Sequence, residues 1–421
     1  MTGDWREASE EGDGAERGRA EAVLAVAIAL VMVVVGAVTV WLLSRPPVHQ
    51  DMASVSSTVA VESAAYAAAE DESRQLARAL AVRENMPGLS LAVAVNGEVV
   101  WAEGFGWADV VERTPMTADT RFRLGALSKP LAAFAAARLH DQGALDLDAP
   151  IQRYVPHYQA RQWTVTTRQL LGDVAGIHRI RGDNNDAMPG QHCDHLDAAV
   201  ALLAEEPLLF EPGTQHRYSI WGWVLVSAAV EGASGEPFDV FMTRQVFEPL
   251  GLARTVAEES EDPDEAINAH APRVMSRMRL GVEEAKRPDY SCLAGGAAFI
   301  STPADLARFG AAMSKPGLLK AETIEAMYRP GRLASGAATT YGLGWTVRQV
   351  PLAGGTVRLV SHRGSPSGGS VSLLVFPDRG LVVAVAANGN LPAGVEPFAM
   401  QVAEAFARQP DRTPGLPRAT P

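Results

Sequence analysis

Hydrophobic positions along this chain follow three distinct patterns, and the first is a continuous apolar run near the start. Residues 22–43 contain no charged side chain. A helix of that length extends about 33 Å, which is enough to cross a hydrocarbon core of about 30 Å. The run is longer than the apolar part of a signal peptide and lacks the polar face of a core helix. It is therefore predicted to be a single uncleaved transmembrane helix.

Positive residues flank this apolar run unevenly. Arg17 and Arg19 stand just before it, whereas Arg45 is the only basic residue that closely follows it. Lys and Arg accumulate on the cytoplasmic side of membrane helices. Residues 1–21 are therefore predicted to form a cytoplasmic tail at the inner (cytoplasmic) membrane, with the C-terminal part extracytoplasmic, in a periplasm. Residues 44–63 are small, polar and proline-containing, and are predicted to be a linker.

The second and third patterns are strand-like runs at both ends of the remaining chain and helical periodicity between them. Residues 89–95 and 98–106 flank Asn96-Gly97, a strong hairpin signal, and residues 356–388 contain three further apolar runs. Helices are expected at 64–83, 127–140, 223–232, 304–313, 321–328 and 395–408. The pattern predicts an α+β domain over 64–408, with one antiparallel sheet and an inserted helical region. Residues 409–421 are expected to be a disordered tail.

Composition and charge narrow the functional classes. The 421 residues carry a net charge of -12 and contain no basic run, which argues against nucleic-acid binding. Cys193 and Cys292 are too few for a disulfide-rich miniprotein, and they fit either one bridge or two separate buried thiols. His178 and the cluster at 192–195 have metal-ligand chemistry, but a polar surface loop is the better interpretation. No metal and no cofactor are predicted.

Six ordered blocks carry a family resemblance. They are FRLGALSKPLAA (122–133), TTRQLLGDVAGI (166–177), the block at 211–252, GGAAFISTPADLARF (295–309), YGLGW (341–345) and HRGSPSGG (362–369). With these blocks the chain resembles the serine β-lactamase and penicillin-binding-protein superfamily, in its class C-like and LACTB-like branch, over about residues 89–388. The resemblance implies a β-lactamase/transpeptidase-like fold and hydrolysis of a β-lactam, ester or D-amino peptide through an acyl-enzyme.

The first motif of that superfamily is Ser-x-x-Lys at a helix N-terminus, where the lysine takes the proton of the serine. This chain keeps Lys129 but has Ala126 at the nucleophile position. A methyl group cannot attack a carbonyl. Ser128 points about 200° around the helix from Ala126 and is not expected to replace the missing serine.

The second motif falls at residues 218–220. The resemblance makes Tyr218 the phenol that relays a proton with Lys129, while Ile220 replaces an asparagine that commonly contacts substrate. We expect Lys129, Tyr218 and His362 to face one cleft. YGLGW is interpreted as packing.

The third motif, Lys-Thr-Gly in penicillin-binding proteins, corresponds to His362-Arg363-Gly364. It is expected on an edge strand of the sheet. The backbone N–H of Ser365 would then pair with that of residue 126 to form an oxyanion hole.

Three functions stay open at this point. The first is a natural non-hydrolytic protein whose cleft binds a small molecule or peptide, a cell-wall fragment included. The second is an active serine hydrolase, or one trapped by an introduced Ser→Ala at 126, and the third is a self-assembling, oligomeric scaffold. Ile220, and Asp173 at a position where relatives usually have histidine, favour the first.

Overall fold

The computed structural model describes residues 7–43, 47–159, 162–178, 192–204, 206–258, 273–275, 282–285 and 289–409. The predicted tail after residue 409 lies outside the described residues. Two units are distinct, and the first contains helix α1 (Glu7–Leu43). Within α1, residues Arg19–Val40 form the one helix segment of the described chain that is long and apolar enough to cross a membrane. The second unit begins at Val48 and holds the rest of the described chain apart from residue 47.

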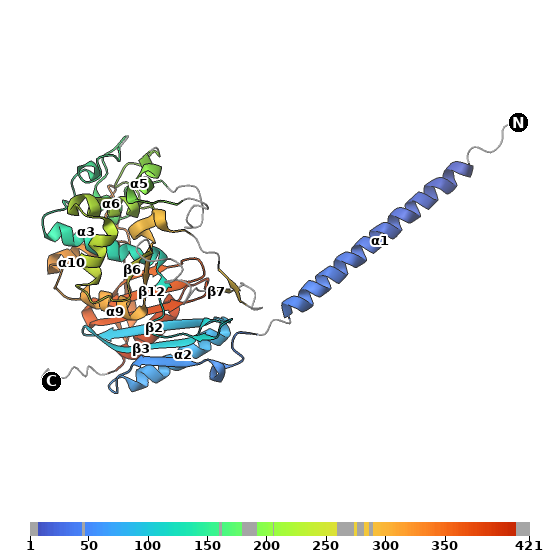
Figure 1. The fold of residues 1–421 in the computed structure, drawn as a ribbon, viewed down its shortest axis with the longest axis horizontal. Helices are drawn as coiled ribbons and strands as arrows, with labels where there is room; N and C mark the ends of the chain where they lie inside the picture. Colours follow the sequence, from blue (N-terminus) through green and yellow to red (C-terminus); the bar gives the residue numbers. More distant parts are fainter. Residues whose placement is uncertain are drawn as a thin grey trace. The chain divides into compact units, whose positions relative to one another are not determined.

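An 8-stranded antiparallel sheet runs through the second unit (Figure 1). Its strand order is β1-β3-β2-β13-β12-β11-β10, with β4 paired to β3. The strands are β1 (Ser57–Val61), β2 (Gly88–Val95), β3 (Glu98–Asp109), β4 (Thr114–Pro115), β10 (Thr346–Leu352), β11 (Gly355–Gly364), β12 (Ser370–Phe376) and β13 (Leu381–Ala387). The order confirms that strands from both ends of the chain build one sheet.

The β2–β3 hairpin and the β2–β13 pairing form the centre of this sheet. Asn96 and Gly97 connect the hairpin with positive φ angles of 53° and 99°, the left-handed conformations that a tight two-residue turn requires. β13 joins the other side of β2, with Leu89 opposite Ala387. The hairpin predicted from the Asn-Gly pair is therefore confirmed.

Both faces of the sheet are covered at its centre, which explains why β2, β12 and β13 are apolar along their length rather than alternating. Leu89, Leu91 and Val93 of β2 belong to a core shared with α2 (Ala67–Arg83) and α11 (Glu396–Ala407). Ala92 and Ala94 belong to the core on the opposite face, which contains α9 (Pro303–Ala312). Figure 1 shows α2 and α9 on opposite sides of β2 and β3.

The inserted helical region lies beyond α9 in Figure 1 and is built around α3 and α6. Its helices are α3 (Ser128–Asp141), α4 (Thr167–Leu171), α5 (Leu196–Ala204), α6 (Gly222–Ser234), α7 (Phe238–Met242) and α10 (Ala321–Tyr328). A small sheet of β5 (Phe122–Arg123), β9 (Phe299–Ser301) and β6 (Val256–Ala257) accompanies them. A separate pair is formed by β7 (Arg273–Met275) and β8 (Val282–Glu284).

The predicted linker, 44–63, is wrong for most of its length. Residues from Val48 onward belong to the folded unit, and Val55 is buried. Ser57–Val61 pairs with β3 as strand β1. The physical reason is that β3 would otherwise present an unpaired row of backbone N–H and C=O groups, which a short polar strand can cover.

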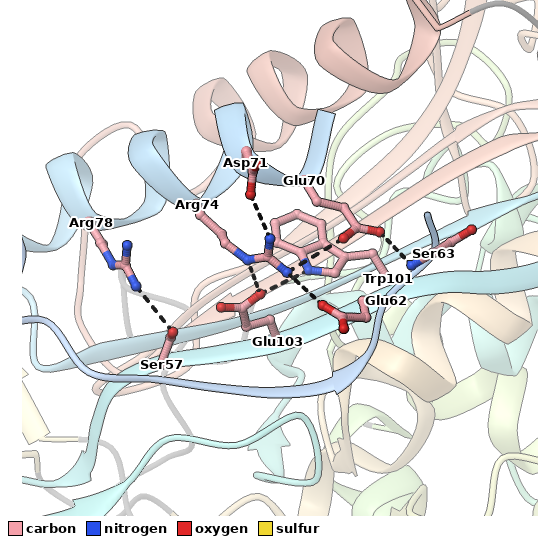
Figure 2. Close-up of polar contacts among 9 residues, drawn as sticks. All are labelled: Ser57, Glu62, Ser63, Glu70, Asp71, Arg74, Arg78, Trp101 and Glu103. Carbon is pink, nitrogen blue, oxygen red and sulfur yellow. Dashed lines mark hydrogen bonds and ion pairs between the residues drawn. The ribbon is translucent and has the colours of Figure 1, made fainter. Parts of the chain in front are cut away.

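A buried ion cluster fixes α2 to this edge of the sheet (Figure 2). Arg74 of α2 donates from Nε to the Glu103 carboxylate of β3 at 2.7 Å, and the Trp101 indole N–H donates to the same oxygen at 3.0 Å. Glu103 is fully buried, whereas Arg74 is partly exposed. The guanidinium also contacts three further carboxylates, those of Glu62, Glu70 and Asp71. Arg74 therefore neutralises acidic groups from the helix, from β3 and from the segment after β1.

Replacing Arg74 by alanine is expected to lower the free energy of unfolding by about 3 kcal/mol, because the Glu103 carboxylate would be left buried without its cation. Urea unfolding of the unit from residue 48 onward, followed by tryptophan fluorescence, measures the change. Arg83→Ala is the matched control, since Arg83 pairs with Glu84 at an exposed site and should contribute less than about 1 kcal/mol. Equal effects of the two substitutions would contradict the role given to Arg74.

Candidate active site

Ala126 lies in a short 3-10 turn, η2 (Gly125–Leu127), that leads directly into α3. The turn packs against β11 and is close to Gly364. A Cβ atom at Gly364 would lie 1.8 Å from the carbonyl oxygen of Leu124, so only glycine permits this approach. The structure thus brings the position predicted for the nucleophile beside the third motif.

β11 lies between β12 and β10, so the expected edge strand is wrong for β11 as a whole. Its pairing with β10 ends at Ser361, whereas its pairing with β12 continues to Gly364. The last residues of β11 therefore have no strand partner on the β10 side, and η2 packs against β11 there. This arrangement leaves the chain around Ser365, which is exposed, next to the turn that contains Ala126.

Ser128 is buried and already engaged. Its Oγ accepts a hydrogen bond of 3.2 Å from the backbone N–H of Phe299 in β9. The side chain has no solvent exposure. Ser128 therefore serves to join α3 to the small sheet, and this role leaves it unavailable as a substitute nucleophile.

Lys129 is the buried cation of the site, with 0% relative exposure. Its Nζ donates to the backbone oxygen of Ser219 at 3.1 Å and forms an ion pair with the Asp173 carboxylate at 3.5 Å. The same atom lies 3.4 Å from the centre of the Tyr218 ring and 5.4 Å from that of Trp223. The carboxylate and the two aromatic faces attract the charged ammonium, whereas its complete burial opposes the charge.

Asp173 is a site residue that the sequence pattern does not identify, because there it differs from relatives only in replacing a histidine. It is 4% exposed and adopts a left-handed φ of 52°, a conformation that aspartate tolerates better than most residues. Oδ1 accepts from the Trp223 indole N–H at 3.2 Å and from the Ser219 N–H at 3.4 Å. Burial raises the pKa of Asp173, while the Lys129 ammonium and the Trp223 N–H oppose that change. No local pattern in the sequence indicates this pairing, because Lys129 lies 44 positions away.

His362 is buried and neutral. Its Nδ1–H donates to the Arg363 backbone oxygen at 2.9 Å, so Nε2 accepts from the Tyr341 hydroxyl at 3.0 Å. Burial, together with the nearby Lys129 charge, lowers the pKa of His362 to about 3. Burial also raises the pKa of Tyr341, which keeps its hydroxyl protonated.

Within YGLGW, the tyrosine and the tryptophan have different roles. Trp345 is fully buried and stacks on Phe309, as the packing interpretation expected. Tyr341 is buried in the same core, as that interpretation expected, and its hydroxyl in addition donates to His362. A hydroxyl on an otherwise apolar block was the only sequence sign of the difference.

The Ile220 side chain is buried in the core and does not line the site. It is 7% exposed, and a Cβ added at Gly296 would lie 3.1 Å from its side chain. Gly296 ends the 3-10 segment η6 (Ser291–Gly296) that packs on α6. Tyr218, two residues earlier, is half-buried against Lys129.

Cys193 and Cys292 form a disulfide, which decides between the two states left open by the sequence. The bond joins the segment before α5 to η6. Cys193 is therefore not free to act as a metal ligand. In the same cluster, His192 makes a hydrogen bond of 2.7 Å with Asp289.

Comparisons with known proteins agree with this architecture. A family profile described as Beta-lactamase matches residues 73–405. Human "Serine beta-lactamase-like protein LACTB, mitochondrial" is 27% identical, over 86% of this chain and 84% of that protein. Esterase EstB of Burkholderia gladioli is 31% identical, over 72% of this chain and 86% of its own length.

Solved structures share the fold. The octameric penicillin-binding protein homologue from Pyrococcus abyssi superposes with a TM-score of 0.65 at 22% identity, covering 79% of this chain and 76% of that one. EstCE1, described as a hydrolase with promiscuous acyltransferase activity, gives a TM-score of 0.66 at 20% identity, covering 82% and 100%. These likenesses show a β-lactamase/transpeptidase fold.

The buried His362 is expected to make stability pH-dependent. Unfolded histidine takes up a proton near pH 6.5, whereas the folded side chain stays neutral until about pH 3. The unfolded state binds more protons between these values, so stability falls as the pH falls through this window, by up to about 1.4 kcal/mol per pH unit. His362→Gln, which keeps an acceptor for Tyr341, should remove this dependence in urea unfolding curves. His195→Gln is the control at an exposed histidine, and identical curves for wild type and His362→Gln would disprove the assignment.

Proposed function

The chain belongs to the beta-lactamase family, and we propose that it is a non-hydrolytic member whose cleft binds a peptide or acyl ligand without forming an acyl-enzyme. The observation that carries this proposal is the combination at the start of α3. Ala126 offers no oxygen to acylate, and the nearby hydroxyl of Ser128 is bonded to β9. Covalent catalysis of the family type needs a side-chain nucleophile at this place.

The state of Lys129 supports the same proposal. A lysine that accepts a proton from serine has to be a neutral amine at that moment. Here the Asp173 carboxylate, the Ser219 carbonyl and the aromatic ring of Tyr218 surround the ammonium. Each of these contacts is weakened or lost when the proton leaves. The lysine acts as a fixed charge in this proposal, and it can attract a carbonyl or carboxylate oxygen of a ligand.

The competing proposal is an active serine hydrolase whose nucleophile has been replaced. It is favoured by the names of the relatives, one of which is an esterase and another a Bacillus subtilis penicillin-binding protein. Under that proposal, Lys129, Tyr218 and His362 remain competent and only the oxygen at position 126 is missing. The two proposals differ in what a single restored serine achieves.

We further propose that α1 anchors the protein in the inner membrane with the second unit on the extracytoplasmic side. Side chains from Arg19 to Val40 are exposed in the structure, as a lipid-facing helix requires. The Cys193–Cys292 disulfide supports the orientation, because such bonds persist in oxidising compartments. The excess of arginines before the helix also supports this orientation, because Lys and Arg accumulate on the cytoplasmic side.

The topology predicts opposite results for two reporter types. A reporter that works only outside the cytoplasm, fused after Pro421, should be active. The same reporter on a chain that ends before Ala22 should be silent, because the membrane segment is then missing. A cytoplasm-only reporter with activity at the C-terminus would exclude the proposed orientation.

The non-hydrolytic proposal predicts that the chain forms no covalent adduct with a fluorescent penicillin or a fluorophosphonate. Ala126→Ser should also stay inactive, because the Asp173 carboxylate pairs with Lys129 and opposes loss of its proton. Adding Ile220→Asn should not restore activity either. Burst-phase hydrolysis of a chromogenic cephalosporin and a p-nitrophenyl ester is the measurement.

Lys129→Ala in the Ala126→Ser background is the matched control for this experiment. A positioned base and an oxyanion hole each contribute about 10² or more in rate, so a competent site would be measurable. A burst in Ala126→Ser that disappears with Lys129→Ala would support the hydrolase proposal instead. Labelling of the unchanged chain at Ser128 would contradict the role of that residue in the core.

A further inference from the structure

A cavity of about 760 Å³, here called the arginine cavity, opens on the surface beside the site. Its lining includes three guanidinium groups, those of Arg168, Arg329 and Arg332. Among the described residues that line it, none is acidic. One wall is Tyr341, whose hydroxyl donates to His362. The cavity therefore adjoins the site through a shared residue.

Backbone hydrogen bonds connect the walls of the arginine cavity. Gly213 donates to the oxygen of Val174 at 2.8 Å, and Ala334 donates to the oxygen of Gly213 at 2.8 Å. Gly331 donates to the oxygen of Tyr341 at 2.9 Å. These bonds join the chain after α4, the turn at 213 and the segment after α10. A ligand would meet a preformed cavity and would not have to order a loop.

The guanidinium groups differ in how far they are already satisfied. Asp148 binds Arg168 with both carboxylate oxygens, at 2.7 and 2.8 Å. Arg332 donates to the backbone oxygen of Gly336 at 3.1 Å. Because this acceptor is a neutral carbonyl, the contact does not compensate the positive charge of Arg332. Within the described part of the chain, the Arg329 side chain makes no hydrogen bond or ion pair.

The carboxylate closest in sequence to Arg329 is engaged elsewhere. Glu325 lies one helical turn earlier, on α10, and both of its oxygens accept from the guanidinium of Arg358, at 2.8 and 3.0 Å. The pKa of Glu325 is lowered first by the hydrogen bond from Arg358, and the charge of Arg329 acts in the same direction. Positive charge therefore remains in excess at the arginine cavity.

We propose that the arginine cavity binds the carboxylate of a ligand whose remaining body is apolar. Guanidinium groups present paired N–H donors that match the two oxygens of a carboxylate. The other walls include Val174, Ala338 and Leu343, which can cover apolar groups. The volume falls in the range of small-molecule sites, about 300–1,000 Å³. This site is additional to the cleft and does not require the cleft to be occupied.

The test uses the full chain in lipid nanodiscs and the water-soluble peptide dansyl-Ala-Val-Leu with a free C-terminal carboxylate. Fluorescence anisotropy should show saturable binding, and the C-terminal amide should bind about tenfold more weakly or worse, since it lacks the charge. Arg329→Ala combined with Arg332→Ala should weaken the free acid by about tenfold or more. Arg153→Ala combined with Arg379→Ala removes the same charge at exposed sites elsewhere and should leave binding unchanged.

A competition arm separates this site from its alternatives. Binding of the free acid that is unchanged in Arg329→Ala combined with Arg332→Ala would overturn the proposal and place the peptide elsewhere, the cleft included. Inorganic phosphate should compete only weakly, because it has no apolar body. Equal binding of acid and amide, complete displacement by phosphate at the peptide's own concentration, or absence of binding would each overturn the proposal.

Discussion

A cation that is removed from water has to be neutralised in place, and in this protein that requirement applies to Lys129. Four groups around it come from separate segments: Asp173 from the chain after α4, Tyr218 and Ser219 from the loop before α6, and Trp223 from α6 itself. Removing any one of them would leave charge or a polar atom less well compensated in a dry environment. The inserted helical region is therefore organised around one ammonium group.

Under the non-hydrolytic proposal, the same constraint connects the loss of catalysis with the stability of the fold. A catalytic lysine has to exchange its proton, and its surroundings then have to stabilise both protonation states. Asp173 favours one state, and it is itself fixed by the Trp223 and Ser219 N–H groups. A site without turnover can keep such a contact, because neither partner has to change its protonation state.

The sequence predicted the sheet well and the site unevenly, for physical reasons. Strand pairing at β2 follows from local signals, the apolar runs and the Asn96-Gly97 turn. The role of Asp173 depends instead on contacts with residues more than 40 positions away, which no local pattern contains. Strand β1 resembles a linker in the sequence, because its exposed residues are equally suited to the edge of a sheet and to an unstructured segment. The hydrogen bond from Tyr341 to His362 was likewise not predicted, since a tyrosine that only packs in the core has the same sequence pattern.

The pairing of β2 with β13 sets the order in which the protein can fold. The Gly88 N–H donates to the side chain of Asn388, a partner 300 positions later in the chain. The β2–β3 hairpin can form as soon as its own residues have been synthesised. The other edge of β2, however, can pair with β13 only after almost the entire polypeptide has been made. High contact order of this kind slows folding and leaves an apolar strand edge exposed to other chains in the interval. We expect the exposure of this strand edge during synthesis, rather than the stability of the final fold, to limit the yield of native molecules.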